Sequence, residues 1–390
     1  MVKKVFSLAW QYFRRLDKIL LILILLICSF SVVLLYSLVQ NNMTQSITSV
    51  DVTLDYTDYR NQAIAAMIGI AFSIVVAVWD YRKFSKLWFI YFPLMIGLTC
   101  LTFTSLGKMG LEGADDRAWI TLGSFSLQPA EFLKLAFILS FSYHCHKTQE
   151  IFNNPLNILG LCVHAAIPIG LVMLQGDDGT AIVFVGIFIA ILFSAGISWK
   201  YILGAGILSP IAVFVMWNYY LQPVHKNRIL AVINPEKYAT KDMLYQTNLA
   251  KIALGSGQLR GKGLFGGDYS YVPVCHNDFI FSYVGQTLGF IGCLGLIILI
   301  GLICLRILGN SLRSSDPLGR FICIGVFAYL FLQSALNIGM VMGITPVIGI
   351  TLPFVSAGGS SMLSATASVG LVMSVYYHSA RFDKIFSKKK

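Results

Sequence analysis

Long apolar runs recur along the chain and are separated by short polar segments. About ten of them approach the ~20 residues that an α-helix needs to cross about 30 Å of hydrocarbon. This pattern predicts an all-α polytopic membrane protein with about ten transmembrane helices. The predicted spans cover residues 19–39, 63–79, 87–103, 127–143, 158–174, 180–195, 201–216, 279–305, 321–342 and 361–377.

Composition supports the same fold class. Hydrophobic residues make up 56% of the chain and charged residues 12%, whereas soluble domains are about 25% charged. The first apolar run is too long for the core of a signal peptide, and no A-x-A cleavage site follows it. We therefore expect it to remain as the first span of a single transmembrane domain covering residues 1–390.

The distribution of charge predicts the orientation of the chain. With the N-terminus in the cytoplasm, most of the 29 Lys and Arg residues lie on the cytoplasmic side and most of the 18 acidic residues lie outside. The positive-inside rule favours this arrangement, with both termini cytoplasmic. The net charge of +11 then reflects orientation and attraction to anionic lipid, and nucleic-acid binding is a poor alternative.

The longest polar segment, residues 218–278, forms a predicted extracytoplasmic loop between the seventh and eighth spans. Residues 243–254 within it predict an amphipathic helix at the membrane interface. The glycine-rich run that follows, residues 255–267, is no Walker loop because its glycines are wrongly spaced and Gly263 follows Lys262. A flexible connector and an anion-facing turn carrying Arg260 and Lys262 both remain open.

Two pairs of charged residues lie at or near the ends of predicted spans. Glu131 and Lys134 are three residues apart and share a helix face. Ionisable groups at membrane depth normally face a cavity or each other, so a local ion pair and a direct ligand role are both open. Asp177 and Asp178 lie in a turn, and we expect Asp178 to cap the next span.

Asp278 has a different setting, because it lies where the large loop enters a span. It follows His276 and Asn277 and precedes the apolar residues 279–281. A carboxylate held at the mouth of a helix bundle could act as a general base. His276 could instead bind a metal ion, but one His and one Asp do not form a metal-binding signature.

Short motifs recur along the chain from the third predicted loop to the last span. They are WI at 119–120, LQPAE at 127–131 with Lys134, QGDDGT at 175–180, NPE at 234–236, YQ at 245–246, the glycines of 255–263, HNDFIF at 276–281, NIGM at 337–340, Pro346 and LPFVSAGGSS at 352–361. In content and order these motifs resemble those of the SEDS family of RodA, FtsW and SpoVE proteins, and the resemblance covers nearly the whole chain.

The resemblance implies a peptidoglycan glycosyltransferase on the outer face of the bacterial cytoplasmic membrane. Such enzymes polymerise lipid II, release undecaprenyl diphosphate, and work with a class B penicillin-binding protein that cross-links the product. The motif at 337–340 and the short tails are more similar to the elongation-type RodA branch, which serves cell shape. The presumed catalytic aspartate of the family falls on Asp278.

The implied chemistry assigns further residues. A sugar hydroxyl must lose a proton to a base, for which Asp278 is the candidate, and the lipid diphosphate leaves as a stable anion. Positive charge would stabilise that anion, with a divalent cation (Mg²⁺ or Mn²⁺) as an additional candidate. The predicted substrate-binding residues are Glu131, Lys134, Lys251, Arg260, Lys262, His276 and Ser360.

Several positions depart from the family pattern. Val274 replaces a common acid, Gln286 and Thr287 replace a Glu pair, and Asp178 replaces a Leu. These changes keep two alternatives open: a flippase for lipid-linked precursor, and a non-catalytic scaffold for a penicillin-binding protein. A transporter often contains inverted repeats, and we find no convincing internal repeat in the sequence.

Overall fold

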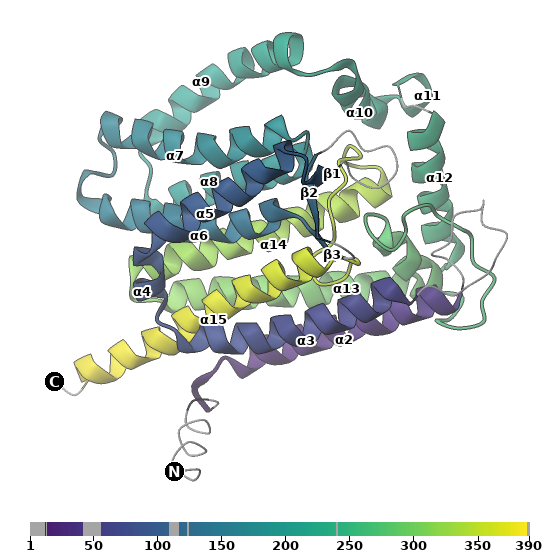
Figure 1. Cartoon of the computed structure of the whole chain (residues 1–390), viewed down its shortest axis with the longest axis horizontal. Helices are drawn as coiled ribbons and strands as arrows, with labels where there is room; N and C mark the ends of the chain where they lie inside the picture. Colours follow the sequence, from purple (N-terminus) through teal and green to yellow (C-terminus); the bar gives the residue numbers. More distant parts are fainter. Residues whose placement is uncertain are drawn as a thin grey trace.

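The computed structural model describes residues 12, 14–41, 56–108, 117–122, 125–238 and 241–387. Within these residues, long helices lie side by side in one bundle (Figure 1). The helices that correspond to the predicted spans are α2 (Lys18–Gln40), α3 (Thr57–Val78), α5 (Trp88–Cys100), α6 (Pro129–Lys147), α7 (Pro155–Leu174), α8 (Asp178–Ala195), α9 (Trp199–Val215), α13 (Ile280–Arg313), α14 (Pro317–Met342) and α15 (Gly359–Ser387).

Seven helices among the described residues are long and apolar enough to cross a membrane. A further apolar helix, α5, continues as the 3₁₀ turn η1 (Leu101–Phe103). The remaining two, α6 and α15, complete the predicted set of spans. The protein is therefore a polytopic α-helical membrane protein, as its hydrophobic pattern predicts.

Short polar side chains begin several of these helices. Asp17 accepts a hydrogen bond from the backbone of α2, Asn154 from α7 and Asp316 from α14. Each satisfies one of the backbone N–H groups that a helix start leaves unpaired. Proline occupies the first turn of α6, α7 and α14, where its missing N–H costs nothing.

The expectation that Asp178 caps α8 is wrong by one residue. Asp177, not Asp178, accepts the Thr180 N–H, at 2.9 Å. The Asp178 carboxylate instead lies 2.6 Å from Nδ1 of His225, a residue of α10 in the large loop. The two neighbouring acids thus have separate contacts, Asp177 with the first turn of α8 and Asp178 with the large loop.

A small antiparallel sheet, which the sequence did not predict, precedes α6. Its strands are β1 (Gly107–Lys108), β2 (Trp119–Leu122) and β3 (Phe125–Leu127), in the order β1-β2-β3. Leu127 pairs with Ile120, so this residue belongs to the sheet and α6 starts at Pro129. On the other side of the bundle, the short helix α4 (Tyr81–Lys86) connects α3 to α5, and the turn η2 (Gln149–Ile151) follows α6.

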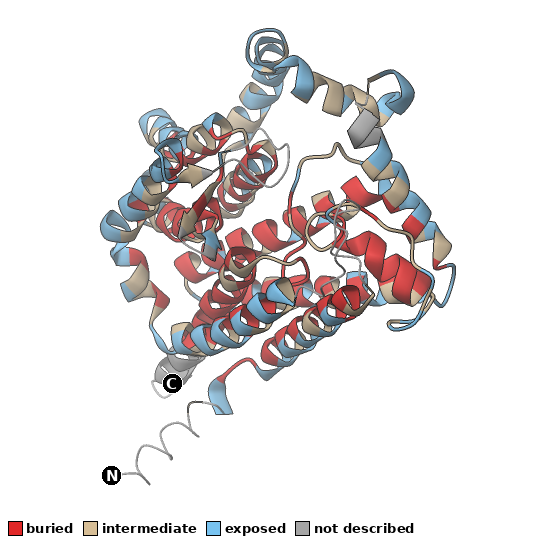
Figure 2. Ribbon diagram, turned by 45° about the vertical axis from the view of Figure 1, so that its right-hand side comes forward, coloured by how far each residue is buried: buried red, intermediate tan, exposed pale blue. Residues whose placement is uncertain are grey.

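The large loop is mostly helical. It starts with the π-helical turn η3 (Met216–Tyr220) and continues as α10 (Pro223–Ile233), α11 (Pro235–Tyr238) and α12 (Lys241–Ser256). The helix predicted at 243–254 is present as α12, which lies across the end of the bundle (Figure 1) and packs against α13; its position at the membrane interface stays a prediction. Helices α9, α10 and α11 contain no buried residue and stand out as exposed (Figure 2).

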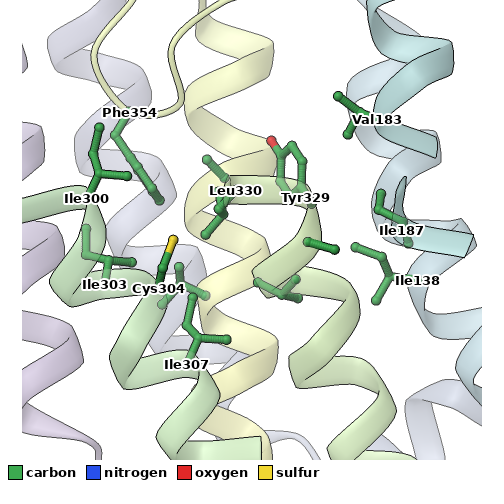
Figure 3. Packing of buried hydrophobic residues seen from close by; sticks show 14 of the residues in the cluster. Ile138, Val183, Ile187, Ile300, Ile303, Cys304, Ile307, Tyr329, Leu330 and Phe354 are labelled. Atoms are coloured by element: carbon green, nitrogen blue, oxygen red, sulfur yellow. The ribbon is translucent and has the colours of Figure 1, made fainter. Parts of the chain in front are cut away.

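Helix α14 lies at the centre of the bundle, because it packs against α6, α8, α13 and α15, and 61% of its apolar window is buried, the largest share among the seven long apolar helices of the described residues. Buried side chains from α6, α8 and α13 surround Tyr329 and Leu330 of this helix (Figure 3). A Cβ atom at Gly325 would lie 2.9 Å from a methyl group of Ile138. Such close approach at small residues is how membrane helices gain packing energy.

Candidate functional site

The residues of the HND motif form a turn-rich segment, residues 275–279, directly before α13; we call it the motif segment. Cys275 and Phe279 at its two ends are buried, and Ile280 behind it is fully buried. Asp278 between these anchors is half-buried. The apolar anchors therefore hold a carboxylate at the boundary between the bundle and the large loop.

The C-terminal signature fixes the backbone of the motif segment. The Ala357 N–H donates to the carbonyl of His276 at 2.8 Å. Next to it, Oγ of Ser356 donates to the carbonyl of Asn277 at 2.6 Å. Two motifs that lie far apart in the sequence are thus joined by two neighbouring hydrogen bonds.

Asn337 of α14 continues this series at the next carbonyl. Its side-chain amide Nδ2 donates to the carbonyl of Asp278 at 2.8 Å and to that of Ile350 at 2.6 Å. Asn337 is fully buried, so both hydrogen bonds are shielded from competing water. One side chain therefore connects α14, the motif segment and the loop that precedes α15.

Glycines line the loop between α14 and α15 where it passes the candidate residues. A Cβ atom at Gly349 would lie 3.6 Å from Oδ2 of Asp278, and one at Gly343 would lie 2.4 Å from Nζ of Lys251. Both glycines have positive φ angles, +61° and +74°, which disfavour other residues. The same loop thus borders the predicted base and one predicted cation.

Glu131 and Lys134 form a buried ion pair inside the bundle. Nζ of Lys134 donates to Glu131 at 2.8 Å and to Oε1 of Gln333 at 2.6 Å. Ser364 and Tyr329 donate to the other carboxylate oxygen of Glu131. The structure therefore shows the local ion pair, and a direct substrate contact of either residue stays a prediction.

This polar network extends to the loop beside the motif segment. Nε2 of Gln333 donates to both the carbonyl and the hydroxyl of Thr351, each at 3.1 Å. The Thr351 hydroxyl lies 3.0 Å from that of Ser361. Nearby, the predicted ligand Ser360 is buried and accepts the Gln128 N–H at 3.2 Å, so its contact joins α15 to the start of α6.

The glycine-rich run packs against a break in α13. Gly289 has φ 67° and ψ −164° inside this helix. A Cβ atom at Gly257 would come within 1.8 Å of the Gly285 carbonyl oxygen, and one at Gly261 within 2.2 Å of that of Thr287. These glycines permit contact between two backbones, which contradicts the flexible-connector interpretation.

The basic residues of this run have separate environments. Nζ of Lys262 donates to the carbonyl of Asp268 at 2.6 Å, while its backbone N–H donates to Gln286 of α13. Arg260 is exposed. An anion-facing role for these two residues stays a prediction.

One departure from the family pattern has a structural explanation. Oε1 of Gln286 accepts the Ser270 N–H at 3.1 Å, and its Nε2 donates to the Ser270 carbonyl at 3.3 Å. A glutamate could accept the first hydrogen bond but could not donate the second. Gln286 therefore fits the neighbouring backbone of the loop in a way that an acid would not.

Asp58 and Gln62 of α3 are site residues that the sequence did not reveal. Oδ2 of Asp58 lies 3.7 Å from Nε2 of His276, and Gln62 contacts residues 356–358. Burial lowers the pKa of His276, while the Asp58 carboxylate raises it in part. Asn337 carried a detectable signal, since it is a polar residue inside an apolar run, but Asp58 carried none.

The described residues contain no group of three or more His, Cys, Asp or Glu side chains that could hold a metal ion. The acidic and histidine side chains of the site, Asp58, His276 and Asp278, do not form such a cluster. A protein-only metal cage does not fit this arrangement. No step of the proposed reaction is therefore assigned to a metal ion.

Comparisons with known proteins agree with this architecture. The family model of the FtsW, RodA and SpoVE cell cycle proteins matches residues 17–381. The probable peptidoglycan glycosyltransferase FtsW of Geobacter metallireducens is 33% identical over 95% of this chain and 97% of its own length. The peptidoglycan glycosyltransferase MrdB of Escherichia coli K12 is 32% identical over 75% of this chain and 79% of its own.

Solved structures show the same fold. A chain of a peptidoglycan synthase complex superposes with a TM-score of 0.74 at 23% identity, covering 93% of this chain and 97% of that one. The rod shape determining protein RodA of Thermus thermophilus gives 0.65 at 23% identity, with the same coverage of both chains. From the family match and the similarity to its curated relatives, the chain belongs to the SEDS family of FtsW, RodA and SpoVE proteins.

Proposed function

We propose that this protein is a peptidoglycan glycosyltransferase that polymerises lipid II on the outer face of the bacterial cytoplasmic membrane. The observation that carries the proposal is the half-buried Asp278, whose segment is fixed by hydrogen bonds to three successive carbonyls. A base needs such a defined position to meet a substrate hydroxyl. Relatives named as peptidoglycan glycosyltransferases support the reaction class.

In the proposed reaction, Asp278 removes the proton from a sugar hydroxyl of the acceptor. The hydroxyl oxygen forms a bond to the anomeric carbon of the donor, and the bond from that carbon to the lipid diphosphate breaks. The electron pair leaves with undecaprenyl diphosphate, which needs no protein acid. A single displacement of this kind inverts the anomeric centre, as in inverting glycosidases.

Lys251 is the favoured partner for the departing diphosphate. Its Nζ lies beside Gly343, in the loop that also passes Asp278. A cation placed where negative charge develops stabilises the transition state. Arg260 and Lys262 are proposed to guide the anionic substrate from the edge of the loop, and dependence on Mg²⁺ or Mn²⁺ belongs in the same assay.

The proposed orientation places both termini in the cytoplasm. Helix α2 begins and α15 ends at one end of the bundle, whereas α12 crosses the other end (Figure 1). Arg82, Lys83 and Lys86 of α4 lie at the first of these ends, as the positive-inside rule favours. The proposed partner is a class B penicillin-binding protein. The motif at 337–340 supports an elongation role, whereas the FtsW relative matches more of the chain than MrdB does.

The direct test is polymerisation of lipid II by the purified full chain in proteoliposomes. The assay includes the cognate penicillin-binding protein, with its transpeptidase site blocked by a β-lactam, and either Mg²⁺ or Mn²⁺. We expect glycan strands longer than the input disaccharide. If lipid II remains unchanged under all of these conditions, the polymerase proposal is wrong and a scaffold role replaces it.

Translocation of lipid-linked precursor is the second candidate, because transporters often contain broken helices and α13 is broken at Gly289. The break is, however, packed against the glycine-rich run. Proteoliposomes loaded with fluorescent lipid II separate the two functions. Transbilayer movement without glycan strands would favour the flippase.

A further inference from the structure

Helix α3 contacts the motif segment from a part of the chain that carries no family motif. Asp58 lies in its first turn, with Oδ2 3.7 Å from Nε2 of His276. The His276 side chain is 20% exposed and that of Asp58 is 46% exposed. The imidazole is thus largely enclosed, and its partner carboxylate lies at the rim of the site.

One turn further along α3, Gln62 holds the C-terminal signature. It is fully buried, and its Nε2 donates to the carbonyl of Ser356 at 3.0 Å. Its Oε1 accepts the Gly358 N–H at 3.2 Å. Because residues four apart lie on the same helix face, Asp58 and Gln62 act on the site from one surface of α3.

These contacts form a closed loop of interactions. Gln62 holds residues 356–358, and Ser356 and Ala357 in turn hold the carbonyls of Asn277 and His276. His276 in turn contacts Asp58 of α3, the helix that also carries Gln62. The backbone of the motif segment is therefore fixed by the signature, and the His276 side chain joins the segment to α3 through Asp58.

We propose that Asp58 is a positioning residue for the glycosyl transfer: by holding the His276 ring against α3, it fixes the orientation of the imidazole in the segment that carries Asp278. This inference rests on the proposed function, because it requires that Asp278 acts on substrate. Without Asp58 the three carbonyl contacts would keep the backbone of the segment in place, but the His276 ring would lose its contact with Asp58. A misplacement of about 1 Å can cost ~100-fold in rate.

The contact is electrostatic as well as geometric. Asp58 of α3 is the charged group that acts on the His276 ring. The Asp58 carboxylate raises the pKa of His276 against the larger lowering by burial. Removing the carboxylate would leave burial as the main influence on the pKa of His276 and would remove the contact of the imidazole with Asp58 of α3.

The experiment compares kcat and KM for lipid II between wild type and Asp58→Ala, Asp58→Asn and Asp58→Glu. We expect Asp58→Ala to lower kcat about 10-fold to 100-fold and to leave KM within about twofold, since the predicted substrate contacts other than His276 are unchanged. Asp58→Glu should restore most of kcat. Asp268→Ala is the matched control, because Asp268 is an exposed acid of the large loop. We expect this variant to have the kcat of wild type.

A double-mutant cycle separates positioning from a general loss of structure. If Asp58 acts through His276, the loss in Asp58→Ala with His276→Ala should be no greater than that in His276→Ala alone. Thermal unfolding of each variant in detergent shows that it is folded, and Asp58→Asn, which keeps the side-chain shape, covers the case in which Asp58→Ala unfolds.

Wild-type kcat in a folded Asp58→Ala or Asp58→Asn variant would overturn the inference, as would losses that add in the cycle. Failure of the proposed function has a different outcome, namely no activity in wild type or full activity in Asp278→Asn. The two failures are therefore distinguished in one set of assays.

Discussion

At the scale of single residues, the candidate site depends on side-chain amides that hold backbone carbonyls. Asn337 and Gln333 are four residues apart on α14 and both bind the loop before α15. Polar residues inside an apolar run could be singled out from the sequence, whereas their partners could not. Asp58 was missed because nothing in the local pattern indicates that the first turn of α3 meets His276.

Substitution of Asn337 by Leu should impair both stability and activity. It removes the hydrogen bonds to the carbonyls of Asp278 and Ile350, and an unsatisfied buried carbonyl costs about 1–3 kcal/mol. Thermal unfolding and the polymerisation assay measure the two effects. Ser334→Ala is the control on the same helix, because its buried hydroxyl has no hydrogen-bond partner; equal effects of both variants would contradict the assigned role of Asn337.

His276 predicts a loss of stability at mildly acidic pH. Burial lowers its pKa below the usual 6.5, so the unfolded chain binds this proton more tightly than the folded protein. The corresponding contribution to the free energy of unfolding is complete above pH 6.5 and is lost as the pH falls through the lower folded pKa. Unfolding temperatures between pH 7.5 and 5.5 should fall further for wild type than for His276→Gln, and parallel curves would refute this.

At the scale of elements, the apolar runs predicted the long helices because length and hydropathy alone decide whether a helix can cross a membrane. The sheet β1–β3 and the helices α10 and α11 were missed, since short polar segments carry weak periodic signals. The glycine-rich run was visible in the sequence, but the break in α13 at Gly289 was not. Their contact is a tertiary feature that neither segment encodes alone.

The packing of the glycine-rich run gives a matched pair of substitutions. Gly257→Ala should destabilise the protein by at least about 1–3 kcal/mol, because the new methyl group would collide with the Gly285 carbonyl. Gly255→Ala places a methyl group in open space at the end of α12 and should be neutral or slightly stabilising. The unfolding temperatures of the two variants test this prediction, and equal destabilisation of both would contradict the close packing at Gly257.

At the scale of the whole molecule, α14 forms the centre, and elements far apart in the sequence meet at one end of the bundle. The sequence motifs predicted which segments contribute to the site, but how these segments are arranged could be seen only in the fold.

The proposed orientation makes a further prediction. A fluorescent protein fused after residue 390 should fluoresce in the cytoplasm, and an exported reporter at the same position should be inactive; the reverse pattern would overturn the orientation.

The central claim is that Asp278 is the base of the glycosyl transfer. Its most direct test is the rate of lipid II polymerisation by Asp278→Asn, which keeps the shape of the side chain and removes its basicity. The account predicts a loss of about 10²-fold to 10⁴-fold in a variant whose unfolding temperature matches that of wild type. Polymerisation by the folded variant at a rate near that of wild type would contradict it.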